Sequence, residues 1–136
     1  IPSSVTSIGY KVFYWCSSLT EITIPSSITT IENKCFSYCF KLAQITIPSS
    51  VTSIGKKVFS KCRSLTQITI PSSVTSIGDQ CFNKCEALAQ VTIHSSSLEL
   101  GKSPFKNCNE LKTINIPKGL KLSLFKLPFR IKVCTI

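Results

Sequence analysis

The stretch IPSSVTSIGKKVFSKCRSLTQIT (residues 47–69) belongs to a tandem array of five near-copies that are joined without a gap. IPSSVTSIGDQCFNKCEALAQVT (70–92) follows it, and IPSSVTSIGYKVFYWCSSLTEIT (1–23) and IPSSITTIENKCFSYCFKLAQIT (24–46) precede it. The fifth copy, IHSSSLELGKSPFKNCNELKTIN (93–115), is degenerate, and residues 116–136 begin in phase and then depart. A fixed period of this length predicts a repeat solenoid, in which each unit is one coil and stacking buries its apolar face.

The end of each unit predicts a short strand. Leu19, Ile22 and Ile24 are spaced so that the two isoleucines share one face of an extended segment, and Pro25 ends the hydrogen-bonded ladder. Stacked copies of this strand form a parallel sheet with one strand per coil. Residues 21 and 23 of each unit then point outward, on the concave face.

The rest of each unit predicts the other sides of the coil. Val5, Ile8 and Gly9 predict a second short extended piece and a turn. Phe13 and Cys16, three residues apart, predict one helical turn or a 3₁₀ segment. We therefore expect a single domain over residues 1–136, wound as a right-handed superhelix. It has a parallel β-sheet of short strands on one face and turns and 3₁₀ or helical segments on the other, with residues 116–136 as a C-terminal cap.

The repeated pattern also resembles a known family. IPxSVTSIGxxxFxxCxxLxxIT is similar to the BspA-like class of leucine-rich repeats, and it covers residues 1–115 of the 136. The resemblance implies a leucine-rich-repeat solenoid. It also implies a module, often surface-associated in bacteria and parasitic protists, that adheres to host matrix proteins or cells. Because one fold serves many functions, the resemblance does not name the ligand.

The outward residues of the strands form the first candidate site. This face is polar and nearly uncharged, and aligned amides and hydroxyls on a rigid sheet offer regularly spaced contacts to a protein or a glycan. Threonine also favours strands where nothing binds, so a solvated strand surface explains the same pattern. The candidate binding face is Glu21, Thr23, Gln44, Thr46, Gln67, Thr69, Gln90 and Thr92.

The turn-and-helix side differs most between repeats. Its first two copies carry aromatic residues where later copies place Lys, Ser, Asn or Arg. An exposed aromatic patch is a contact candidate, and lateral packing against upstream sequence is the alternative. The candidate patch is Tyr14, Trp15, Tyr38 and Phe40.

The C-terminal end is strongly basic. The chain has 16 Lys and Arg against 6 Asp and Glu, and residues 102–136 hold eight of the basic residues against Glu110 alone. Apolar and mainly basic residues alternate from Phe125 to Cys134, which predicts a strand that caps the open end of the sheet. Contact with anionic lipid or a partner is the alternative. The candidate basic end is Lys118, Lys121, Lys126, Arg130 and Lys132.

The eight cysteines predict a buried ladder of thiols rather than a site, because free cysteine is among the most buried residue types. Four ligands around one zinc ion are not available, since cysteines two coils apart cannot converge. Disulfides between adjacent coils fit the permitted Cα separation but are poorly aimed. Five cysteines share one phase, namely Cys16, Cys39, Cys62, Cys85 and Cys108, and Cys35 and Cys81 share another.

Other function classes find little support. His94 is the only histidine, and the six acidic residues fall on different phases of the coil, so we expect no catalysis, no metal and no cofactor. The net charge of +10 attracts phosphate, but no known nucleic-acid reader motif is present, so we expect no specific nucleic acid. No run of 18 apolar residues exists, so we expect no membrane span.

The compartment stays open between two hypotheses. The resemblance favours a cell-surface adhesion module, whereas the thiol core and the absence of an Asn-x-Ser/Thr acceptor favour an intracellular scaffold in the cytoplasm. Self-association through the open ends of the solenoid is a third possibility. The chain contains no Met and starts at a repeat boundary, so we expect it to be part of a longer protein.

Overall fold

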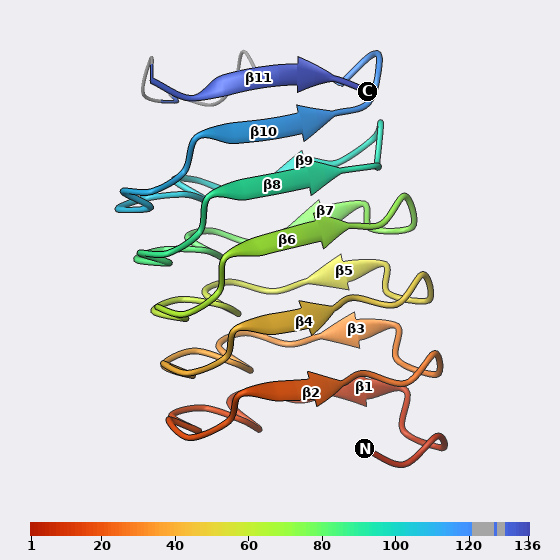
Figure 1. Cartoon of the computed structure of the whole chain (residues 1–136). Coiled ribbons are helices and arrows are strands. Elements are labelled where there is room, and N and C mark those ends of the chain that lie inside the picture. The colour runs from red at the N-terminus through yellow and green to blue at the C-terminus, as the bar shows by residue number, and fades with distance from the viewer. Residues whose placement is uncertain (121–126, 128–129) are drawn as a thin grey trace.

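The structure, a computed structural model, describes residues 1–120, 127 and 130–136. We number the coils 1 to 5 for residues 1–23, 24–46, 47–69, 70–92 and 93–115. Two columns of parallel strands run along the stack, one behind the other (Figure 1). The short-strand sheet contains β1 (Ser7–Ile8), β3 (Thr30–Ile31), β5 (Ser53–Ile54), β7 (Ser76–Ile77) and β9 (Glu99–Leu100).

The second column, which we call the long-strand sheet, carries the strand predicted at the end of each unit. It comprises β2 (Glu21–Thr23), β4 (Gln44–Thr46), β6 (Gln67–Ile70), β8 (Gln90–Ile93), β10 (Thr113–Ile116) and β11 (Lys132–Thr135). Strands β6, β8, β10 and β11 form one hydrogen-bonded group, and β2 pairs with β4 in line with them (Figure 1).

The pairing register confirms the predicted solenoid of parallel strands. Ser7 pairs with Thr30 in the short-strand sheet, and Gln67 pairs with Gln90 in the long-strand sheet, each 23 residues apart. Because parallel pairing at the repeat length places equivalent residues side by side, each type of side chain forms a ladder along the stack. Any residue therefore has its counterparts in the coils before and after it as neighbours.

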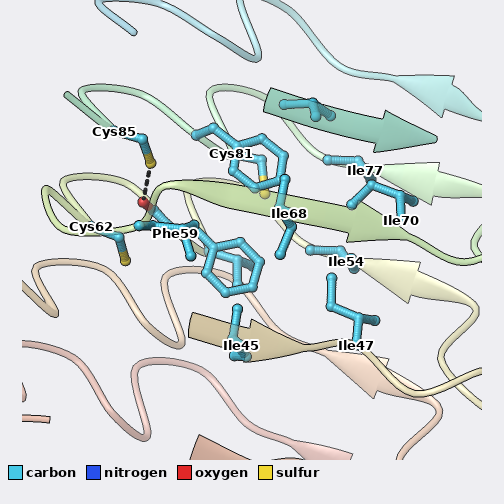
Figure 2. Close-up of a cluster of buried hydrophobic side chains, with 14 of the residues drawn as sticks. Ile45, Ile47, Ile54, Phe59, Cys62, Ile68, Ile70, Ile77, Cys81 and Cys85 are labelled. Atoms are coloured by element: carbon cyan, nitrogen blue, oxygen red, sulfur yellow. Dashed lines mark hydrogen bonds between the residues drawn. The ribbon is translucent and has the colours of Figure 1, made fainter. Parts of the chain in front are cut away.

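The core lies between the two sheets and the segment that connects them. Phe59 is fully buried and stacks between Phe36 and Phe82, with ring centroids 5.7 and 5.5 Å apart. Inward-pointing isoleucines of both sheets surround it, among them Ile54 and Ile68 (Figure 2). Burying each such side chain contributes about 1.5–3 kcal/mol, which a single coil cannot obtain alone.

The segment that connects the sheets, which we call the turn side, corrects one prediction. It comprises residues 9–19 of coil 1 and their equivalents, and among the described residues it is a run of turns with no helical or 3₁₀ segment. Two residues of each coil have positive φ, for example Lys57 at 54° and Lys61 at 62°. Left-handed residues at these points prevent a right-handed helical turn from continuing. The spacing of Phe13 and Cys16 reflects these turns instead.

Hydrogen bonds between coils hold the turn side in this conformation. The N–H of Phe59 donates to the carbonyl of Cys81 at 2.9 Å, and that of Lys61 donates to the carbonyl of Asn83 at 2.7 Å. Ser60, which lies between them, instead donates its N–H within the coil to the carbonyl of Lys57 at 3.2 Å. The turn side is thus a third inter-coil ladder, in which alternate residues bond to the next coil and so satisfy the backbone.

The step from β10 to β11, which follows coil 5 and which we call the last coil, is shorter than the others. Thr113 pairs with Lys132, so β10 and β11 are offset by 19 residues rather than 23. The strand predicted from Phe125 to Cys134 is therefore too long at its start: Leu127 and the segment 130–131 lie outside β11, and residues 125, 126, 128 and 129 lie outside the described residues. The register with β10 sets where extended structure pairs, and local alternation fixes only which residues face inward, not how much of the segment pairs with β10. Ile131 is buried, whereas Val133 is 43% exposed on this edge strand.

Candidate functional site

The predicted binding face lies on the outer side of the long-strand sheet. Gln67 and Thr69 are exposed on either side of buried Ile68, and the same alternation recurs in β4. Thr92 is half-buried, and its hydroxyl accepts a hydrogen bond from the amide of Asn115 at 3.2 Å. The structure thus places the eight predicted residues on one regular surface, of which all but Thr92 are exposed.

The four predicted aromatic residues form one cluster on the turn side of coils 1 and 2. Trp15 stacks on Tyr38, with ring centroids 4.4 Å apart and planes inclined by 21°. Phe40 lies edge-on to Trp15 at 5.6 Å, and Tyr14 lies edge-on to Tyr38 at 5.4 Å. Trp15 is 53% exposed and the other three are half-buried. The cluster therefore presents an indole whose orientation is fixed by its neighbours.

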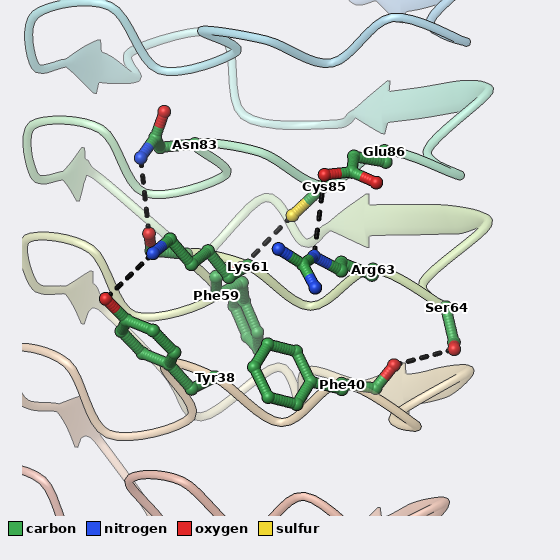
Figure 3. A network of polar contacts seen from close by, with 10 residues as sticks. Tyr38, Phe40, Phe59, Lys61, Arg63, Ser64, Asn83, Cys85 and Glu86 are labelled. Carbon is green, nitrogen blue, oxygen red and sulfur yellow. Dashed lines mark hydrogen bonds and ion pairs between the residues drawn. The ribbon is translucent and has the colours of Figure 1, made fainter.

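Two cations of coil 3 extend this aromatic cluster, and the sequence analysis did not pair them with it. The ammonium of Lys61 donates a hydrogen bond to the Tyr38 hydroxyl at 2.9 Å and lies 4.3 Å from the centre of its ring (Figure 3). The guanidinium of Arg63 lies 5.0 Å from the ring centre of Phe40. Such cation–π contacts add to the stacking. The sequence contained the information needed to pair these residues, because residues 38 and 61, like residues 40 and 63, are one period apart.

The lysines also change the chemistry of Tyr38. Its pKa is lowered, first because Lys61 donates a hydrogen bond to the phenol oxygen, and further because the charges of Lys61, Lys84 and Lys34 stabilise the phenolate. Partial desolvation opposes this shift. The turn side of coils 2 to 4 is thus a region of positive potential.

The predicted basic end is only partly described. Lys118, Arg130 and Lys132 are exposed, and Lys121 and Lys126 lie outside the described residues. The guanidinium of Arg130 donates a hydrogen bond to the carbonyl of Cys108 at 3.2 Å. This contact ties the last coil to coil 5, so at least one of the predicted basic residues has a structural contact.

The cysteine ladder lies in the wall of the turn side. All eight cysteines are free, and six of them are buried. The thiol of Cys85 donates a hydrogen bond to the carbonyl of Phe59 in the preceding coil at 3.1 Å (Figure 2), a contact that the sequence analysis missed. Burial raises the pKa of Cys81 to about 12, so its thiol stays protonated and unreactive. The same thiol bond occurs at Cys39, Cys62 and Cys108.

The described residues offer little for other kinds of chemistry. They contain no group of three His, Cys, Asp or Glu side chains placed to hold a metal ion. His94, the only histidine, is exposed at the end of β8. In this part of the chain no helix has the length and apolar character needed to cross a membrane.

The family follows from the repeats. The model of the BspA type leucine rich repeat region matches residues 6–126 in six copies. The chain belongs to the BspA-type leucine-rich-repeat family. No curated protein matches it significantly.

Solved structures of bacterial leucine-rich-repeat proteins share this fold. The T. pallidum leucine rich repeat protein is 30% identical with a TM-score of 0.81, over 96% of this chain and 63% of that one. A leucine rich cell surface protein from Faecalibacterium prausnitzii is 34% identical with a TM-score of 0.81, over 85% and 31%. A leucine-rich repeat protein from Bacteroides ovatus is 26% identical with a TM-score of 0.84, over 100% and 36%. The chain spans less than two thirds of each, and the shared architecture is that of a repeat module for interaction with other proteins.

Proposed function

We propose that this chain is a non-catalytic adhesion module, which binds a protein or glycan partner through the outer surface of its solenoid. The observation that carries the proposal is the cluster on the turn side of coils 1 to 3. It gathers residues that differ from repeat to repeat, whereas the outer face of the long-strand sheet repeats Gln and Thr. A surface whose side chains change along the stack can distinguish one partner from another.

The cluster has the amino-acid composition of a binding hot spot, a small group of residues that contributes most of the binding free energy. Trp, Tyr and Arg dominate the binding free energy of protein interfaces, and Trp15, Tyr38 and Arg63 lie together here. The stacking partners also fix the orientation of Trp15 before a partner arrives. Less conformational entropy is then lost on binding.

Two further observations bear on the setting. The Faecalibacterium protein similar to this chain is a cell surface protein, which supports adhesion. The eight free thiols support the alternative, an intracellular scaffold that binds a protein partner. Both settings use the same exposed surface. They differ in the compartment that supplies the partner.

The test is direct binding of the purified chain to immobilised extracellular-matrix proteins and glycans, measured by surface plasmon resonance. We expect at least one to bind, and Trp15→Ala with Phe40→Ala to weaken that binding at least about thirtyfold, since one residue at the centre of an interface contributes on the order of 2 kcal/mol. The matched control is Gln67→Ala with Gln90→Ala on the opposite sheet. Binding to none of the surfaces contradicts adhesion, and loss only in the glutamine control moves the site to the long-strand sheet.

A further inference from the structure

We propose that a basic pocket on the turn side binds a sulfated sugar residue of a glycan. This inference rests on the proposed binding function and names a ligand chemistry for it. The pocket has a volume of about 260 Å³ and lies beside the aromatic cluster, so that Tyr14 and Tyr38 form part of its wall. Its remaining wall comes from coils 2, 3 and 4.

Four lysines converge on this pocket from three successive coils. Lys34, Lys57, Lys61 and Lys84 are all half-buried, whereas lysine side chains are mostly exposed in proteins. All four are anchored by the backbone, because each is a left-handed residue whose N–H group donates a hydrogen bond to the next coil. The lysines are thus part of the inter-coil ladder rather than a loose surface tract.

The positive charge of the pocket is not compensated within the described residues. None of its lining residues carries a carboxylate. The two acidic side chains of coil 4 pair with other cations: Asp79 lies 4.0 Å from Lys56, and Glu86 lies 3.4 Å from Arg63. Four clustered ammonium groups favour a ligand with several negative charges in a small volume.

The aromatic residues of the pocket argue against a nucleic acid. Single-stranded nucleic acids bind by stacking bases on exposed aromatic faces. Trp15 stacks on one face of Tyr38, and the ammonium of Lys61, bonded to the hydroxyl, lies 4.3 Å from the ring centre. The ring of Tyr14 has Lys11 above it at 4.6 Å. The ligand must therefore be recognised by charge and hydrogen bonds.

Size and hydrogen-bonding groups favour a sugar. The pocket is smaller than the roughly 300–1,000 Å³ of sites for drug-sized molecules, which suits one ring rather than a run of residues. Besides the two tyrosines, its neutral polar lining residues are Ser37, Ser60 and Asn83, and the amide oxygen of Asn83 has no hydrogen-bond partner among the described residues. An amide oxygen can accept a hydrogen bond from a sugar hydroxyl. A sulfated sugar places more than one ionised ester on a single ring, whereas an acidic peptide supplies one charge per side chain.

Fluorescence titration tests the proposal on the intact chain, because Trp15 is the only tryptophan and stacks on Tyr38. The probe is a fully sulfated heparin tetrasaccharide. We expect saturable binding, which Lys57→Gln with Lys61→Asn weakens at least about tenfold. These substitutions preserve the backbone, because Gln80 and Asn107 occupy the same places in later coils with φ of 53° and 60°. Bound sulfates also raise the pKa of Tyr38, and Tyr38→Phe identifies that titration.

Matched probes and variants decide the outcome. The control pair, Lys41→Gln with Lys112→Gln, removes the same charge from exposed lysines outside the pocket and should leave the affinity within about twofold. Equal loss in both pairs, or equal binding of the desulfated tetrasaccharide, overturns the proposal. Tighter binding of a single-stranded oligonucleotide or of polyglutamate assigns the pocket to those ligands instead. If the variant Lys57→Gln with Lys61→Asn loses tetrasaccharide binding but still binds a protein partner, the pocket is distinct from the surface that carries adhesion.

Discussion

The outer face of the long-strand sheet and the turn side share one 23-residue register, yet only the turn side changes character along the stack. The sheet repeats its glutamines, with Gln67 directly opposite Gln90. The corresponding column of the turn side reads Trp15, Tyr38, Lys61, Lys84 and Asn107. A solenoid converts residues one period apart into neighbours, so substitutions in successive repeats create a surface without altering the backbone. Specific recognition is therefore expected on the side that varies.

The two regions also differ in what stabilises them. The sheet relies on parallel strand pairing and on inward isoleucines such as Ile68. The turn side relies on left-handed residues such as Lys61, on carbonyls that accept from the next coil, and on buried thiols such as Cys81. Perturbations that act on thiols or on close backbone contacts should therefore affect the turn side and spare the sheet.

The largest effect is expected from alkaline pH. Burial raises the pKa of Cys35 and Cys81 to about 12 from 9.0, so above pH 9 the unfolded chain releases protons that the folded chain retains. This stabilisation is fully present below pH 9 and is lost as the pH rises towards 12. Cys81 alone contributes a fall of up to about 1.4 kcal/mol per pH unit. Urea unfolding in reductant at a series of pH values from 8 to 11 measures the slope.

A matched variant isolates the thiols. Cys35→Val with Cys81→Val installs the residue that coil 3 already carries at the same place, Val58, and should make the fall with pH shallower. An unchanged slope would show that other groups cause it. Thiol titration checks the premise, since half-buried Cys16 and Cys134 should react in the folded protein and the six buried thiols only after unfolding.

The next largest effect is expected where the short-strand sheet enters the turn side. A Cβ on Gly78 would lie 2.5 Å from the backbone N of Lys56 and 2.6 Å from the carbonyl carbon of Gly55. Gly78→Ala must therefore push two coils apart, at a cost of at least about 2 kcal/mol in the free energy of unfolding. In Gly9→Ala the nearest atom is a methyl of Val12 at 3.5 Å, and we expect a change within about 0.5 kcal/mol. Chemical denaturation measures both variants. If Gly78→Ala and Gly9→Ala lowered the free energy of unfolding equally, the close contact at Gly78 would not set the spacing of the coils.

The sequence predicted the sheet better than the turn side, for a physical reason. A strand with one buried face leaves a period-two pattern, so the alternation of apolar and polar residues is enough to assign Ile68 inward and Gln67 outward. Positive φ leaves no such trace, because Lys61 and Trp15 belong to residue types that seldom adopt it. Only inter-coil hydrogen bonds, which depend on the stacked neighbour, stabilise those conformations.

The candidate sites divide in the same way. The aromatic cluster was predicted, because its residues stand out against the consensus of the repeat. The contact of Lys61 with Tyr38 was missed, because each position was compared with the consensus and not with its neighbour one period away. The start of β11 was misplaced, because the alternation before Lys132 fixes the inward face but not where pairing with β10 begins. Comparing residues one period apart would have predicted the contact of Lys61 with Tyr38. The same comparison would not have predicted the register of β11 with β10.

The smallest effect is expected from changes on the regular face. Gln44→Arg, Gln67→Arg and Gln90→Arg together alter the charge and bulk of the long-strand sheet while leaving its inward side untouched. Exposed substitutions of this kind usually change stability by less than about 0.5 kcal/mol each, with a small added cost from like charges on paired strands. Affinity for a matrix protein or glycan should stay within about twofold of the unmodified chain, because a partner bound on the turn side does not meet these residues. If the triple arginine variant lost affinity markedly while its urea unfolding stayed normal, the long-strand sheet rather than the turn side would be the binding surface. Uniformity along the sheet would then itself be the recognised feature, and the aromatic cluster would serve packing.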